Sequence, residues 1–362
     1  MIEPAPRTAA EKPSGRPSGH PAAAFATAAR VPAPQPETPL AELRTYARRR
    51  VPNARVFLKL EMCQPTGSIK GRAAARMVRR AIEDGRLRPG QTIVETSSGN
   101  TAAALASASA SLGCRVRALV PAGLGRARLE RLEMHRVEID ERPDAPSPSA
   151  RQRLARAIVE SDPQAFVSLE QFSNIEHVRA HREQTGPEIA SQIAGVSERG
   201  GEALDSFDVY VAGVGTGASF AGIAEGLVDA GAGGRLRRCL VDPVGSRLVP
   251  LLRGEAPGPP MQLEAPDGIG ADGWGSFVRP ETIDHAFAIH RHEALAEVAA
   301  VRDAEGYLVG PCTGFALAGL RRYADACGKD GMAALVVATD RGEFYSHDPR
   351  FRAALKLDAT TD

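Results

Sequence analysis

Short apolar runs alternate with helical stretches in two series along this chain, and this alternation restricts the folds open to it. Strand-like runs of the first series cover residues 55–61, 91–95 and 114–123, with helical spacing over 71–87, over 101–113 and from about Arg151. Those of the second cover 207–215, 237–244, 305–311 and 333–340, with helices ending near 230 and beginning near 313. Strand, helix and strand in succession are typical of parallel sheets. The sequence therefore predicts an α/β protein of two doubly wound domains with a cleft between them.

The charge balance and the cysteine pattern restrict the partners and the compartment. The 362 residues carry 45 basic and 44 acidic side chains, so a net charge of +1 favours a small-molecule partner over nucleic acid or a membrane. Five cysteines without a C-x-x-C pair indicate a reducing, cytoplasmic setting with neither a disulfide framework nor a metal site. No apolar run is long enough to cross a bilayer. Residues 1–36, rich in Pro and Ala without periodicity, are expected to form a disordered tail.

Four glycine-rich or polar loops follow predicted strands. They are PTGSIK (65–70), ETSSGNT (95–101), GVGTGAS (213–219) and VGPCTG (309–314). Open α/β sheets bind their ligands at the carboxyl ends of the strands. These loops are therefore the candidate ligand-binding segments.

The loop GVGTGAS is a candidate anion site. It follows a strand and opens a helix, so its backbone N–H groups point at one place, and the hydroxyls of Thr216 and Ser219 add hydrogen bonds. We expect this loop to bind a phosphate group. The loop also matches G-x-G-x-x-A, and Asp242 ends the next strand, so this loop alone leaves a dinucleotide site open, as well as a tight turn without a ligand.

Lys70 is an unusual choice in this chain, because only five of the 45 basic residues are lysines. A lysine can lose its proton in a partly desolvated site and then attack a carbonyl carbon, which arginine cannot do. A phosphate loop and a single amine on separate loops are what pyridoxal phosphate requires.

Seven motifs carry a family resemblance. They are LEMCQPTGSIKGR, IVETSSGNT, QFSN with QTGPEI, AGVGTGAS, GIGA, EGYLVGPCTG and TDRGEFY. In this order they resemble the cysteine synthase and cystathionine β-synthase family of pyridoxal-phosphate-dependent enzymes, which has the tryptophan synthase β-like fold (fold type II). The resemblance runs from Thr38 to about Ser346.

The resemblance implies a role for each candidate site residue. Lys70 would hold the cofactor as the internal aldimine and move the Cα proton, and Asn100 would hydrogen-bond the ring oxygen. Cys312 stands where the family usually has a serine facing the pyridine nitrogen, with Thr313 as the alternative partner. The cofactor phosphate would be bound by Gly213, Gly215, Thr216, Gly217 and Ser219. The substrate carboxylate would be bound by Ser97, Ser98, Gly99, Thr101 and Gln171.

The resemblance also implies a domain division and an oligomeric state. Residues 61–174 would form a smaller, mobile domain that carries Lys70. Residues 37–60 and 175–350 would form a larger domain that carries the phosphate loop, with a C-terminal tail at 351–362. The enzyme would be a homodimer.

The implied reaction is β-replacement on an O-activated serine, acetylated or phosphorylated, or on a similar amino acid, through an aminoacrylate intermediate. The product would be cysteine or another β-substituted alanine, such as a diaminopropionate precursor or another specialised metabolite. The alternatives are β-elimination to a keto acid and ammonia, a dinucleotide-binding oxidoreductase and a non-catalytic protein that binds pyridoxal phosphate.

Two departures from the family pattern bear on the reaction. Gly71 replaces the aspartate usual after the lysine, which removes a charge from the start of a helix. The segment 271–280 is longer than in sulfide-using members and contains the only tryptophan, Trp274. That segment either shapes the pocket of the second substrate or forms a surface loop.

Overall fold

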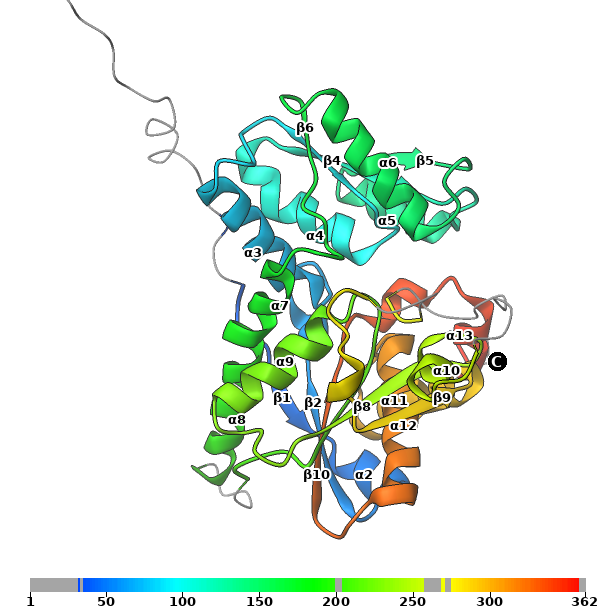
Figure 1. The fold of residues 1–362 in the computed structure, drawn as a ribbon. Coiled ribbons are helices and arrows are strands. Elements are labelled where there is room, and N and C mark those ends of the chain that lie inside the picture. The colour runs from blue at the N-terminus through cyan, green and yellow to red at the C-terminus, as the bar shows by residue number, and fades with distance from the viewer. Residues whose placement is uncertain (1–31, 33–34, 199–203, 257–267, 271–274, 358–362) are drawn as a thin grey trace, which may run out of the picture. The chain divides into compact units, whose positions relative to one another are not determined.

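The computed structural model describes residues 32, 35–198, 204–256, 268–270 and 275–357, all within the unit Val31–Asp362. Most of the expected N-terminal tail, Trp274 and residues 358–362 lie outside these ranges. The described part contains two sheets with helices on their faces (Figure 1). The predicted α/β class is confirmed.

The larger sheet has six strands in the order β1-β2-β10-β7-β8-β9. Their bounds are β1 Leu40–Glu42, β2 Ala54–Lys59, β10 Met332–Val337, β7 Val209–Gly213, β8 Arg237–Pro243 and β9 His285–Ile289. Only β1 pairs antiparallel, with β2, and the other pairings are parallel. Such a sheet is buried on both faces, and every residue of β10 is accordingly buried.

Helices cover both faces of this sheet, because alternate strand residues point to opposite sides. Val209 and Val211 pack in one apolar cluster with residues of helices α11 and α12, whereas Tyr210 packs in a second cluster with residues of α8 and α9. The helices are α2 Arg44–Arg50, α8 Gly186–Glu198, α9 Ala218–Asp229, α10 Leu248–Leu252, α11 Arg291–Glu305, α12 Pro311–Cys327 and α13 Pro349–Ala354.

The smaller sheet has four parallel strands in the order β5-β4-β3-β6. They are β5 Glu138–Glu141, β4 Arg115–Val120, β3 Thr92–Glu95 and β6 Phe166–Val167, and the associated helices are α3 Lys70–Glu83, α4 Asn100–Ser109, α5 Arg126–Met134 and α6 Pro148–Ser161. Ala155 of α6 packs on Val94 and Leu119 of the sheet. Helix α7 Glu176–Ala180 and a π-helical turn, His181–Thr185, lead into α8.

One predicted strand is wrong. Residues 306–310 of this run form a loop and its two ends lie in helices, because Gly306 ends α11 with a left-handed backbone (φ 78°) and Gly310 precedes α12. Within this loop Val309 makes a single bridge to Arg341. The strand beside β8 is instead β9, which the sequence reading missed because its residues are mostly half-buried and give no alternating apolar pattern.

The expected C-terminal tail also begins too early. Helix α13 reaches Ala354, and the side chains of Phe351 and Leu355 are buried in the same cluster as α12. Residues 351–355 therefore belong to the folded core.

Candidate active site

Loops at the carboxyl ends of strands from both sheets meet around a cavity of about 530 Å³. Of the predicted site residues, Lys70, Ser97, Ser98, Gly99, Asn100, Thr101, Gln171, Gly215 and Thr216 line it. Gly213, Gly217, Ser219 and Cys312 are not among its lining residues. The structure thus brings together segments as far apart in the sequence as 70 and 216.

Lys70 begins helix α3 and its amine lies in this cavity. The preceding residue, Ile69, donates a backbone hydrogen bond to the Thr339 carbonyl (2.8 Å), so the lysine loop is tied to the end of β10. Burial lowers the pKa of Lys70 to about 8, and nearby Cys312 and Asp340 oppose this shift only in part. About a tenth of the amine is therefore neutral at pH 7, far more than for an ordinary lysine, and the neutral form is the one that a nucleophile or base requires.

His177 contacts the Lys70 amine, with 3.5 Å between its Nε2 and the lysine Nζ. Its Nδ1 lies 3.1 Å from the Gln171 carbonyl oxygen and must donate to it, so Nε2 carries the lone pair that faces Lys70. Burial and the nearby lysine lower the pKa of His177 to about 3, so the ring stays neutral. The sequence reading gave His177 no role, and nothing in its local pattern marks this contact.

The loop after β3 forms the second side of the cavity. Thr101 donates to the Gln171 side chain (2.7 Å), and the Gln171 amide donates to the Thr96 carbonyl (2.8 Å), so these residues hold one another in place. Gly99 precedes α4 and supplies no side-chain cap. The Ser97 hydroxyl oxygen accepts from the Ala102 backbone N–H (3.1 Å), so the backbone N–H groups of Asn100 and Thr101 are the ones left for an anion.

A buried carboxyl group supports this loop from behind. Glu95 accepts hydrogen bonds from the backbone N–H of Thr96 (2.9 Å) and of Gln171 (3.4 Å). Burial raises the pKa of Glu95 to about 7, although these two donors favour the ionised form.

The buried Glu95 predicts a pH-dependent stability difference. A carboxyl whose pKa is raised on folding contributes stability that is lost as pH rises, here between 4.5 and about 7. We expect the unfolding free energy of the wild type to fall by about 3 kcal/mol relative to Glu95→Gln over this range. Urea unfolding of both proteins across the range measures it, with exposed Glu160→Gln as the control. Parallel curves for wild type and Glu95→Gln would contradict the assignment.

The predicted anion loop precedes α9, which has no acidic residue in its first turn. Gly217 takes a left-handed backbone (φ 85°) to turn the chain into the helix. A Cβ on Gly215 would lie 2.4 Å from the Gly268 carbonyl oxygen, so only glycine permits this close approach. Gly215 and Thr216 of this turn line the cavity, and the Thr216 hydroxyl oxygen accepts from the Ala218 backbone N–H (3.3 Å) at the start of the helix. The cavity therefore adjoins a helix N-terminus that suits an anion.

Asn100 joins two segments at the floor of the cavity. Its side-chain amide donates to Asp340 (2.9 Å), which also accepts from the Tyr345 hydroxyl (2.7 Å). Among the described residues, the side-chain oxygen of Asn100 (Oδ1) is buried without a hydrogen-bond partner, and so is the hydroxyl of Thr313. Asp340 and Tyr345 were not predicted as site residues, although both stand in the motif TDRGEFY.

Cys312 and Thr313 both lie in the first turn of α12. The Cys312 sulfur lies 4.0 Å from the position that a Cβ on Gly268 would take, and Gly268 lines the cavity. Asp242 does not line it. Instead Asp242 is buried and accepts from the Leu248 backbone N–H (3.2 Å) at the start of α10, so it adds no support to a dinucleotide site.

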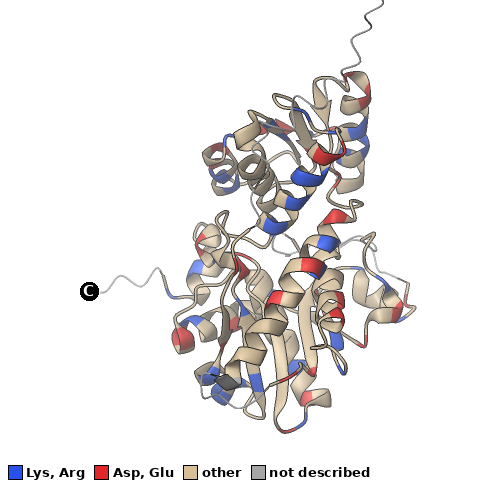
Figure 2. Cartoon of the chain, turned by 90° about the vertical axis from the view of Figure 1, so that its left-hand side faces the viewer, with Lys and Arg blue, Asp and Glu red and all other residues tan. Residues whose placement is uncertain are grey.

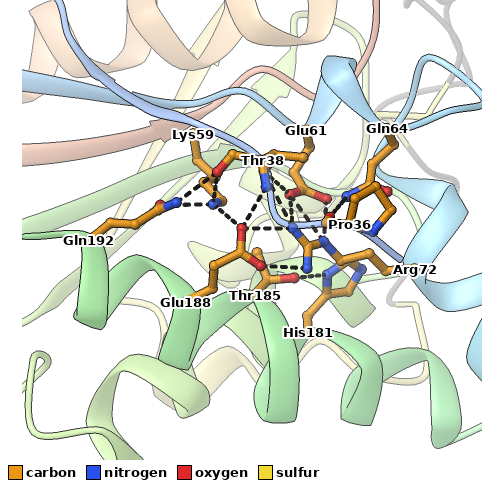
Figure 3. Close-up of polar contacts among 10 residues, drawn as sticks. All are labelled: Pro36, Thr38, Lys59, Glu61, Gln64, Arg72, His181, Thr185, Glu188 and Gln192. Atoms are coloured by element: carbon orange, nitrogen blue, oxygen red, sulfur yellow. Dashed lines mark hydrogen bonds and ion pairs between the residues drawn. The ribbon is translucent and has the colours of Figure 1, made fainter. Parts of the chain in front are cut away.

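A buried ion network surrounds Arg72, which follows Lys70 by two positions in α3 (Figure 3). Arg72 of α3 donates to Glu61 (2.8 Å) and to Glu188 of α8 (2.7 Å), and Lys59 of β2 also pairs with Glu188. Thr38 donates its hydroxyl to Glu61 (2.6 Å) and its backbone N–H to Glu188 (2.8 Å). The network fixes the first turn of α3 to the larger sheet.

Gly71 fits this crowded setting. A Cβ at that position would lie 3.3 Å from the side-chain oxygens of both Gln35 and Thr66, which is tighter than an ordinary contact. The aspartate expected there would need its neighbours to shift.

Acidic and basic residues intermingle along the chain (Figure 2). In the described residues, no group of three potential metal ligands occurs. None of the helices in the described part has the length and apolar character needed to span a membrane.

Comparisons with known proteins agree with this geometry. The family model described as "Pyridoxal-phosphate dependent enzyme" matches residues 33–340. The cysteine synthase of Haemophilus influenzae is 33% identical over 79% of this chain and 86% of its own length, and the probable cysteine synthase of Bacillus subtilis is 31% identical over 81% and 88%. The crystal structure of an O-ureido-L-serine synthase superposes with a TM-score of 0.76 at 26% identity, covering 90% of this chain and 94% of that one.

Proposed function

The chain belongs to the family of pyridoxal-phosphate-dependent enzymes, and from this premise we propose that it catalyses β-replacement on an O-activated serine or a similar amino acid. The relatives named above are cysteine synthases, and the structural neighbour makes another β-substituted alanine. The observation that carries the proposal is the single cavity in which the Lys70 amine meets two separate anion-binding loops. One loop suits the cofactor phosphate and the other the substrate carboxylate.

The residues present fit the cofactor. The N-terminus of α9 with Thr216 suits its phosphate, and Lys70 suits its aldehyde. The unpartnered oxygens of Asn100 and Thr313 are buried polar atoms that a polar aromatic ring would satisfy. When bound, the cofactor withdraws electrons from the substrate Cα, which makes the Cα proton acidic and lets the β-substituent leave.

The chain itself supplies binding, proton transfer and exclusion of water. Ser97, Ser98 and the open N–H groups of α4 bind the carboxylate, with Thr101 and Gln171 locked beside them. Once free of the cofactor, the Lys70 amine takes the Cα proton, and the neutral His177 ring accepts a hydrogen bond from it.

The proposal includes a division of labour between the two sheets. The four strands of the smaller sheet all lie between residues 92 and 167, which supports a smaller domain at 61–174 that closes on the captured carboxylate. The larger domain, 37–60 with 175–350, keeps the phosphate loop fixed. Closure would exclude water and prevent loss of the activated substrate as a keto acid.

The reaction is tested by supplying donors and nucleophiles separately. Holoenzyme is mixed with O-acetyl-L-serine, O-phospho-L-serine or L-serine, with and without sulfide or an amine, and both β-substituted alanine and pyruvate are measured. We expect the substituted alanine to form at the expense of pyruvate. Pyruvate released at the full rate whether or not a nucleophile is present would instead establish β-elimination.

The proposed enzyme is a cytoplasmic homodimer. All five cysteines lie in the described ranges and none forms a disulfide, which fits a reducing compartment. Sedimentation equilibrium of the holoenzyme tests the dimer, and a monomer mass at micromolar concentration would refute it.

A further inference from the structure

The charges around the cavity are unbalanced. Among the described residues that line it, Lys70 and Arg151 are the only charged ones, and no carboxylate is present. Lys70 is committed to the cofactor in the proposed function. Arg151 is then the one permanent positive charge that faces the bound amino acid.

Arg151 is buried and lacks an acidic partner. Its side chain lies in α6, only 7% of the residue is exposed, and the hydrogen bonds described for its guanidinium go to backbone carbonyls rather than to a carboxylate. One terminal nitrogen, Nη1, donates to the carbonyls of Ala145 (2.9 Å) and Pro146 (2.8 Å), which fixes the guanidinium plane. Its Nε is buried without any hydrogen-bond partner. Burial alone lowers the pKa of Arg151, with no neighbouring charge to oppose the shift.

A buried guanidinium without a counter-charge destabilises the folded state unless an anion binds to it. Removing a charge from water without a partner carries a large desolvation penalty, and an arginine presents Nε–H and Nη2–H as a fork that matches a carboxylate or phosphate. The first turn of α6 contributes Ser149 to the same wall of the cavity and contains no acidic residue. The helix N-terminus therefore adds a favourable field for an anion.

The other two anions of the proposed reaction already have their own places. The cofactor phosphate takes the start of α9, and the substrate α-carboxylate takes the start of α4. Arg151 stands on a third helix, α6, and lines the same cavity beside Gln152. No described hydrogen bond joins it to the loops before α4 and α9.

We propose that Arg151 binds a third anion, a phosphate or carboxylate group carried by one of the two substrates away from the α-carboxylate. This rests on the proposed function and specifies its substrate class. The anion is either the phosphate ester of a donor such as O-phospho-L-serine or the carboxylate of an amino-acid nucleophile. Neutral donors with sulfide would leave Arg151 without its partner.

The test compares Arg151→Met with Arg153→Met, which removes an exposed positive charge from the same helix. Holoenzyme is titrated with O-phospho-L-serine and with O-acetyl-L-serine, and the cofactor absorbance reports binding of each. Turnover is then measured with O-acetyl-L-serine and either sulfide or L-homocysteine as nucleophile. Inorganic phosphate is added in a separate thermal unfolding series.

If Arg151 binds the phosphate of the donor, Arg151→Met should weaken binding of O-phospho-L-serine by about 10- to 100-fold and leave the affinity for O-acetyl-L-serine unchanged. If Arg151 instead binds the carboxylate of the nucleophile, Arg151→Met should raise the KM for L-homocysteine by about 10- to 100-fold and leave that for sulfide unchanged. In the first case inorganic phosphate also raises the melting temperature of the wild type and not of Arg151→Met. Arg153→Met behaves as wild type throughout.

Two results overturn the proposal. Equal weakening of O-acetyl-L-serine and O-phospho-L-serine would place Arg151 at the α-carboxylate, and no change with any substrate would leave it without a ligand. Both failures keep the proposed function intact as long as amino acids still change the cofactor absorbance. If no amino acid changes the absorbance of the wild type, the proposed function itself fails.

Discussion

Lys70→Ala is expected to lower the β-replacement rate by about 10³-fold or more, because it removes both the attachment point of the cofactor and the base at Cα. The lysine is the only amine among the described residues that line the cavity. Lys70→Arg should fail to the same degree, since a guanidinium keeps the positive charge but cannot form the covalent bond. The pair of variants thus separates charge from nucleophilicity.

The measurement has two parts. Steady-state rates are compared with those of Lys329→Ala, which removes an exposed lysine that pairs with Asp208 on the surface. Borohydride reduction of the holoenzyme followed by peptide mapping then identifies the amine that carries the cofactor. A label on Lys59, or activity retained in Lys70→Ala, would contradict the assignment of Lys70 and with it the proposed function.

Local sequence predicted the parts of this site that depend on local structure. The loops around Lys70, Asn100 and Thr216 each follow a strand and open a helix, and such turns have a recognisable glycine and hydroxyl pattern. Because parallel strands share one edge, the sequence also predicted that these loops meet. The strand at 305–311 was wrong because an apolar run between two glycines also suits a loop that packs against the core.

The remaining site features depend on contacts between distant residues. His177 reaches Lys70 over 107 positions, and Asp340 reaches Asn100 over 240. The burial of Arg151 in the cavity wall is likewise a property of the folded chain, since the sequence shows only that its nearest acidic residues, Asp144 and Glu160, are seven and nine positions away. Only the tertiary structure determines which charges have partners.

The second large effect is on stability and concerns Arg72. Its guanidinium is 2% exposed and neutralises two buried carboxylates, those of Glu61 and Glu188 (Figure 3). In Arg72→Met, Lys59 is the one positive charge of this network that remains to neutralise the carboxylates of Glu61 and Glu188. Breaking a buried pair from one side costs about 3–5 kcal/mol, because it leaves an uncompensated charge out of water. We expect a loss of this size in the unfolding free energy.

Urea unfolding compares Arg72→Met with Arg80→Met, which lies on the same helix and pairs with Glu83 at the surface. The control should lose less than about 1 kcal/mol. Adding Glu61→Gln to Arg72→Met should recover part of the loss, since the excess negative charge is then removed. Equal effects of Arg72→Met and Arg80→Met would show that the network contributes no more than surface pairs.

The pH dependence of the stability loss in Arg72→Met tests whether the charge of the arginine causes that loss. Burial opposes ionisation of Glu188, but hydrogen bonds from Arg72 and Lys59 prevail and hold its pKa below 4.5. A carboxyl with a lowered pKa contributes stability that is present above its unfolded pKa and is lost as pH falls through the folded one. The difference between wild type and Arg72→Met should therefore narrow below pH 4.5. A difference that stayed constant into acid would mean that packing of the arginine stem, rather than its charge, stabilises the start of α3.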